Sequence, residues 1–158
     1  MRRRIAIAVF MGALLLPAAA EAKSSKLKGN VEGDSNSSIT MKVEIATNSF
    51  PPGAPPSPFK VKKFKFKGID NGCGREVSGV VKNLAIGGSG PGGTGGDYAY
   101  EVETLEADAP AGSDGYVIEG TVDQKSKNSS GTIKFLEATG EGTFTPCGEV
   151  TYKVKKKK

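Results

Sequence analysis

The chain contains no histidine, so any chemistry it performs rests on carboxylates, lysines and two cysteines. Histidine-dependent catalytic triads and dyads, HExxH zinc sites and imidazole acid–base catalysis are therefore excluded. A pair of carboxylates can still hydrolyse a glycosidic bond without histidine. The candidates lie in the segment 97–124, which carries Glu101, Glu103, Glu106, Asp108, Asp114 and Glu119.

No spacing singles out two of these carboxylates as a catalytic pair. Glu101 and Glu103 would share one face of a strand about 7 Å apart, which suits an inverting hydrolase but not a retaining one. The chain also has no tryptophan on which a sugar ring could stack. Calcium could bind the same carboxylates together with residues 112–115, but no DxDxDG spacing occurs. We therefore expect a protein that is not an enzyme and has no cofactor or metal, with a glycan hydrolase as the alternative.

Lysines form the second chemical signal. Three alternate with two phenylalanines in the middle of the chain, and four end it. Such groups can bind an anionic cell-wall phosphate polymer, an acidic polysaccharide or a phospholipid surface, or they can protect an edge strand and solvate a chain end. Nucleic acid fits poorly, because the core needs the two phenylalanines that could stack on bases. The anion-binding candidates are Lys63, Lys65, Lys67, Lys155, Lys156, Lys157 and Lys158.

The first 22 residues have the organisation of a secretory signal peptide. Arginines at 2–4 precede an apolar block at 5–16, and Ala20 and Ala22 stand where a signal peptidase reads small residues. The apolar block is too short to cross a membrane, which needs roughly 20 residues. We expect cleavage before Lys23 and a secreted or periplasmic product without a transmembrane segment.

Cys73 and Cys147 are the only cysteines. An even number of cysteines in an exported chain predicts one disulfide between them. No CxxC spacing indicates a redox pair, and two thiolates without histidine cannot fill a tetrahedral zinc site unless carboxylates contribute.

Alternation of apolar and polar residues predicts strands along the whole mature chain, and no stretch has a helical period. Val61 and Ile69 break the alternation of their strand, which predicts a bulge or a strand end there. Turn residues occupy 33–36, and the segments 50–58 and 87–96 are predicted loops rich in proline and glycine. The GxGxxG match in the second loop lacks the helix that would bind a pyrophosphate, so we interpret it as a linker. The expected strands span residues 27–31, 38–45, 60–69, 77–86, 98–105, 116–122, 132–136 and 150–154.

These elements predict one all-β domain, a single antiparallel β-sandwich or barrel-like domain of about seven to nine strands. The domain is expected to span residues 23–154, followed by a flexible basic tail at 155–158. Residues 23–82 carry eleven basic and five acidic side chains, whereas residues 97–124 carry eight acidic ones and no basic one. Either the molecule is electrically polarised or strands of opposite sign pair within the sheet, and we favour the second interpretation.

Several short motifs can be compared with known proteins. After the leader come Leu27-Lys28-Gly29, a turn, an alternating strand at 39–45 and the mid-chain Cys73. The chain closes with Ser130-Gly131-Thr132-Ile133 and then Cys147-Gly148-Glu149-Val150-Thr151-Tyr152-Lys153. Together these motifs resemble the small secreted proteins of unknown function that are common in actinobacteria. The resemblance covers most of the mature chain and implies a disulfide-linked β-sandwich with an extracellular location, but no activity.

The leading functional hypothesis is an exported, non-enzymatic binding or envelope-associated protein that contacts anionic cell-surface polymers through its lysines. The alternatives are the histidine-free hydrolase with residues from 97–124, and an inhibitor of a secreted enzyme that uses the proline-rich loop. Asn36 and Asn128 each begin an N-x-S glycosylation sequon, which matters only in a host that glycosylates exported proteins.

Overall fold

The computed structural model describes residues 22–46, 59–84, 97–106, 108–123 and 125–157. The expected leader, apart from Ala22, lies outside these ranges, as do the two loops expected at 50–58 and 87–96.

The described residues form eight strands and no helix, as the alternation predicted. The last strand runs to Lys156, so Lys155 and Lys156 belong to it, where we expected a tail to begin. The strands are β1 (Ala22–Val31), β2 (Ser38–Ala46), β3 (Phe59–Asp70), β4 (Glu76–Leu84), β5 (Tyr98–Glu103), β6 (Asp114–Val122), β7 (Asn128–Gly140) and β8 (Thr143–Lys156).

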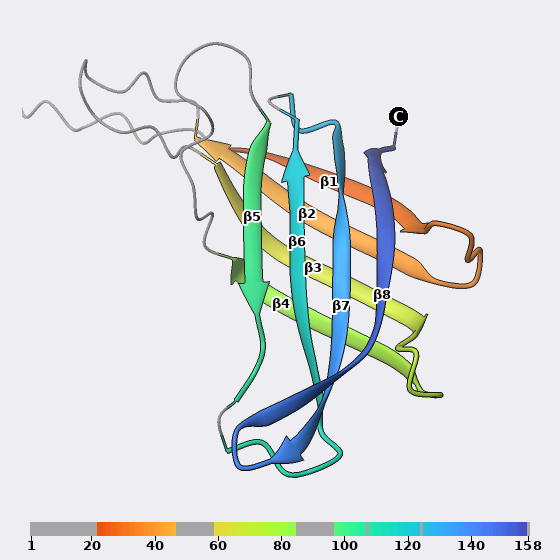
Figure 1. The fold of residues 1–158 in the computed structure, drawn as a ribbon. Coiled ribbons are helices and arrows are strands. Elements are labelled where there is room, and N and C mark those ends of the chain that lie inside the picture. The colour runs from red at the N-terminus through yellow and green to blue at the C-terminus, as the bar shows by residue number, and fades with distance from the viewer. Residues whose placement is uncertain (1–21, 47–58, 85–96, 107, 124, 158) are drawn as a thin grey trace, which may run out of the picture.

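All eight strands belong to one antiparallel sheet in the order β4-β3-β2-β1-β8-β7-β6-β5. Each half of the chain is a meander of four neighbouring strands, and the first and last strands join the halves. β4 and β5 are the two edges, and they approach each other without pairing. The sheet is therefore a nearly closed, barrel-like structure in which β1–β4 cross behind β5–β8 (Figure 1). The predicted fold class is confirmed.

Two register shifts in β3 account for its broken alternation. One lies opposite the Lys42/Val43 step of β2, so that Val61 and Phe64 both face inward although their spacing is odd. The other lies between Phe66 and Ile69, in the pairing with β4. A bulge adds one residue to one strand and restores the orientation of the side chains beyond it. Of the two alternatives predicted from the sequence, a bulge or a strand end, the register shifts favour a bulge near both Val61 and Ile69.

Aromatic rings from both halves meet in the core. Phe64 of β3 packs edge-on against Tyr152 of β8, with ring centroids 5.3 Å apart. Phe66 packs against Tyr116 at 5.0 Å and Phe135 at 6.0 Å. Edge-to-face pairs of this kind stabilise a core beyond the burial of their area. The same alternation that turns the phenylalanines of β3 inward turns its lysines outward.

One interior row combines two tyrosines and two glycines. Tyr100, Gly120, Gly131 and Tyr152 lie opposite one another across β5, β6, β7 and β8. The two phenol hydroxyls are hydrogen-bonded to each other, and that of Tyr100 is also bonded to the hydroxyl of Ser129 at 2.9 Å. A Cβ atom on Gly120 would lie 2.5 Å from the Tyr100 hydroxyl, so only glycine leaves room for this arrangement.

Candidate functional site

Four lysines stand directly opposite one another on the outer face of the first half of the sheet. Lys26 of β1 pairs in register with Lys42 of β2, Lys42 with Lys63 of β3, and Lys63 with Lys82 of β4. Their Cβ atoms are about 5 Å from those of their neighbours, as in any antiparallel pair. All four side chains are exposed. We call these four residues the lysine row.

A second line of residues runs beside the lysine row, two positions further along each strand. Here Lys155 of β8 lies opposite Lys28, Lys28 opposite Thr40, and Thr40 opposite Lys65. Lys67 follows on β3, opposite a serine of β2. We call the lysine row together with Lys28, Lys65, Lys67 and Lys155 the basic face.

No lysine of the basic face forms a salt bridge within the described ranges. The nearest ion pair on these strands joins Lys62 to Glu44 at 2.8 Å, and Lys62 is the residue that the bulge adds to β3. The face also has a depression of about 540 Å³. Hydroxyl groups join the lysines in its lining, which consists of Ser24, Ser25, Lys26, Lys28, Thr40, Lys42, Lys63 and Lys65.

The structure brings most of the predicted anion-binding lysines together and adds others. Lys63, Lys65, Lys67 and Lys155 all lie on the basic face. Lys156 and Lys157 are exposed at the end of β8 and beyond it, and Lys158 lies outside the described residues. Sequence reasoning missed Lys26, Lys28, Lys42 and Lys82, although each neighbours an inward-facing apolar residue or lies on a predicted strand.

The acidic residues gather on the opposite half of the sheet. Glu101 of β5 lies opposite Glu119 of β6, and both face outward. Glu119 forms a salt bridge of 3.0 Å with Lys134 of β7, and the carboxylates of Glu119, Glu149 and Glu101 raise the pKa of Lys134. We call Glu101, Glu103, Glu119 and Glu149 around Lys134 the acidic patch.

The favoured interpretation that strands of opposite sign pair within the sheet is therefore wrong. The lysine-bearing β2 and β3 pair with β1 and β4, whereas the acidic β5 and β6 pair with each other and with β7, so no strand of the first group pairs with one of the second. β4 and β5, which are consecutive in the chain, are the unpaired edges. The molecule is electrically polarised, with a basic face on one wall and an acidic patch on the other.

The carboxylates proposed for hydrolysis or calcium do not converge on one point. Asp114 contacts Arg75 through its Oδ1 atom, 2.9 Å from Nη2, at the far end of β6 from Glu119. Glu106 and Asp108 lie exposed in the loop between β5 and β6. Within the described strands, only Glu101 and Glu119 of the set are cross-strand neighbours, and both line an open depression together with Ala99, Tyr100, Gly120, Thr121, Ser130, Gly131 and Thr132.

No family model, curated protein or solved structure matches this chain. The resemblance to secreted actinobacterial proteins therefore stays a hypothesis that rests on the motifs alone. Within the described residues, no helix is long and apolar enough to cross a membrane.

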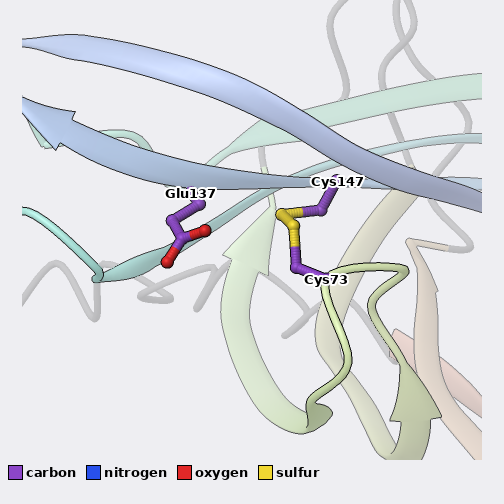
Figure 2. Close-up of side chains that lie close together, drawn as sticks. All are labelled: Cys73, Glu137 and Cys147. Carbon is purple, nitrogen blue, oxygen red and sulfur yellow. A yellow bond between two sulfur atoms is a disulfide. The ribbon is translucent and has the colours of Figure 1, made fainter.

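The predicted disulfide is present between Cys73 and Cys147, with an S–S distance of 2.02 Å. It joins the turn between β3 and β4 to β8, and Glu137 of β7 lies beside it (Figure 2). Two cysteines and one carboxylate are the ligand types of a zinc site. The sulfur atoms are instead bonded to each other, and Glu137 accepts a hydrogen bond from Arg75 at 3.1 Å. These residues close one end of the sheet rather than offer a metal site.

Polar contacts strengthen that closure. The Oδ1 atom of Asn71 accepts hydrogen bonds from the backbone N–H groups of Cys73 and Arg75, and its Nδ2 atom donates to Asp114. Arg75 donates to the carbonyl oxygen of Gly112 at 3.0 Å and contacts two carboxylates. We call the disulfide with Asn71, Arg75 and their partners the end clamp.

Proposed function

We propose that this protein is an exported, non-enzymatic binding protein that holds an anionic cell-surface polymer on its basic face. One observation carries the proposal: four lysines lie in direct cross-strand register with no carboxylate among them. Like charges directly opposite each other destabilise a sheet. A polyanion laid on the row relieves that repulsion and releases its own counterions, which favours binding.

The composition of the face indicates which property of the ligand is recognised. Every cation on it is a lysine, a flexible point charge without the planar fork with which arginine binds carboxylates and phosphates in two places. Serine and threonine hydroxyls in the depression add donors for anionic oxygens. Val80 of β4 is the only large exposed hydrophobic side chain in the described residues, so the face has no aromatic platform for bases or sugar rings. The ligand is therefore bound by its charge density.

Export is part of this proposal. The disulfide is typical of an oxidising compartment. β1 begins at Ala22, so cleavage before Lys23 would remove one strand residue and leave the rest of β1 paired with β2. Intact mass measured with and without reductant tests it. We expect a chain that starts at Lys23 and is two hydrogens lighter before reduction; a thiol-containing chain that retains the leader would contradict export.

Polymer binding is tested by paired lysine substitutions. The row variant carries Lys42→Gln and Lys63→Gln together. The turn variant carries Lys125→Gln and Lys127→Gln together, which remove the same charge from the turn between β6 and β7. The probe is long-chain polyphosphate, titrated at several salt concentrations. The logarithm of the binding constant falls linearly with the logarithm of the salt concentration. We expect this dependence to be less steep in the row variant by about 1.4, because each lysine contributes about 0.7 on a single-stranded polyanion.

The matched turn variant should leave the slope unchanged. Removal of Lys157 and Lys158, which leaves β8 complete, should weaken binding less than the row variant does. Equal losses in the row and turn variants would mean that only net charge matters, and the basic face would not be the site. An unsubstituted protein that binds no polyanion at about 0.1 M salt would refute the proposed function.

A further inference from the structure

The lysine row has a direction that the lysines of β3 alone do not have. One line of lysines follows β3 and consists of Lys63, Lys65 and Lys67. The lysine row instead crosses four strands, roughly at right angles to β3. Hydrogen bonding fixes the distance between neighbouring strands at about 4.8 Å. The four lysines of the row are therefore evenly spaced and span roughly 14 Å in all. The alternate direction, along β3, has a longer repeat of about 7 Å.

The lysines are spaced more closely across the strands, at about 4.8 Å, than along any strand, where the repeat is about 7 Å. The lysine row is uninterrupted from β1 to β4. Along β2, by contrast, Lys42 is flanked on the same face by Thr40 and by Glu44, which already pairs with Lys62. A polyanion that followed β2 would meet one free cation and one carboxylate. A polyanion that crosses the strands meets a cation at every step.

The curvature of the sheet bears on the shape of the ligand. A row that crosses the strands follows the direction in which a nearly closed sheet bends, and Figure 1 shows β1–β4 as a twisted layer. A flat lipid surface touches only the crest of such a layer. A flexible chain can bend with it and contact all four lysines.

From these observations we infer that the ligand is a linear phosphate chain, laid along the lysine row across β1–β4, with Lys26 and Lys82 as its outer contacts. The inference rests on the proposed function and names its ligand class. A phosphate chain carries a charge at every short repeat and is flexible. A polysaccharide separates its charges by bulky rings, so it would leave lysines of the row without a partner.

The direction of binding is tested with two single variants that remove the same charge. Lys82→Gln removes the last lysine of the row, and Lys67→Gln removes the last lysine of the line along β3. Both side chains are exposed and free of salt bridges within the described residues, so neither change should affect folding. With polyphosphate as the probe, we expect Lys82→Gln to weaken binding about as much as Lys63→Gln, by several-fold, and Lys67→Gln to weaken it less than twofold.

A length series tests the class of ligand. The affinity for linear polyphosphate should increase with chain length until the chain spans the roughly 14 Å of the row. Beyond that length, the affinity per bound protein molecule should no longer increase. A glycerol phosphate polymer distinguishes a phosphodiester source from inorganic polyphosphate. Hyaluronan and anionic vesicles, compared at equal total charge, should bind at least tenfold more weakly.

Two results would overturn the inference while the proposed function stands: a larger loss from Lys67→Gln than from Lys82→Gln, or equal affinity for phosphate chains, hyaluronan and vesicles at equal charge. Absence of binding to every polyanion would instead refute the proposed function itself. Circular dichroism and intact mass of each variant establish that the sheet and the disulfide have formed.

Discussion

At the scale of the residue, the tightest constraint is the interior row of Tyr100, Gly120, Gly131 and Tyr152. Gly120→Ala would place a methyl group 2.5 Å from one tyrosine hydroxyl and 2.6 Å from the other. Overpacking of this kind costs about 1–3 kcal/mol. We expect the midpoint of urea unfolding to fall by the corresponding amount, while Thr121→Ala, on the exposed face of the same strand, changes it little.

A double substitution tests whether the tyrosine hydroxyl is the cause. Tyr100→Phe removes the atom closest to the new methyl group, so Gly120→Ala should cost less in that background than in the unsubstituted protein. Additive losses would show that Gly120 is required for another reason, such as the backbone of the strand.

The same tyrosines predict a sensitivity to alkali. Burial raises the pKa of Tyr100 to about 12, although its hydrogen bonds to Ser129 and Tyr152 act in the opposite direction, and burial also raises the pKa of Tyr152. In the unfolded chain a tyrosine ionises near pH 10. The stabilisation from a protonated Tyr100 is therefore complete below pH 10 and is lost as the pH rises to about 12.

We expect the free energy of unfolding of the unsubstituted protein to fall between about pH 10 and 12 by up to 1.4 kcal/mol per pH unit for each such tyrosine. The slope should be smaller in Tyr100→Phe. Urea titrations at several alkaline pH values measure it, and equal slopes in the two proteins would contradict the assignment to Tyr100.

At the scale of the element, the end clamp holds the turn between β3 and β4 against β6, β7 and β8. The disulfide spans 74 residues of sequence. Replacing Cys73 and Cys147 with alanine should destabilise the fold by about 4 kcal/mol, because the unfolded chain regains the entropy of that loop. Differential scanning calorimetry of the two proteins measures the loss, and an unchanged melting temperature would mean that the clamp does not depend on the disulfide.

Arg75→Ala tests the polar part of the end clamp. It removes contacts to Gly112, Asp114 and Glu137 and leaves the two carboxylates without their cation. We expect a loss of about 1–2 kcal/mol in urea unfolding. Lys134→Ala, which breaks one exposed ion pair on β7, is the control and should cost less. The reverse order would show that Arg75 acts only at the surface.

The elements themselves could largely be read from the sequence, because side-chain alternation is a local property of a strand. The turn at 33–36 is present, with the backbone N–H of Asn36 donating to the Asp34 carboxylate at 2.8 Å. The ends of the strands could be predicted less well from the sequence. β1, β7 and β8 are longer than expected, since pairing with a neighbour extends a strand through residues such as Lys23–Lys26 or Thr143–Thr145 that do not alternate.

At the scale of the whole molecule, the basic face and the acidic patch lie on opposite walls. A protein bound to a polyanion through the first therefore turns the second toward solvent. Acetylation of lysines, read by mass spectrometry, should show Lys26, Lys42 and Lys63 protected several-fold by polyphosphate. Lys125 and Lys127 should react as in the free protein, and uniform protection of all lysines would contradict an oriented complex.

Sequence alone determined the all-β class, the inward and outward faces of β2, β3 and β5, the broken alternation of β3, the disulfide and four lysines of the basic face. All of these depend on neighbours along the chain or, for the disulfide, on there being two cysteines. Only the tertiary structure decided that Lys26, Lys42, Lys63 and Lys82 form one row, and that the acidic strands lie opposite it. The order and register of strands are set by packing and hydrogen bonds between distant segments, which no local pattern records.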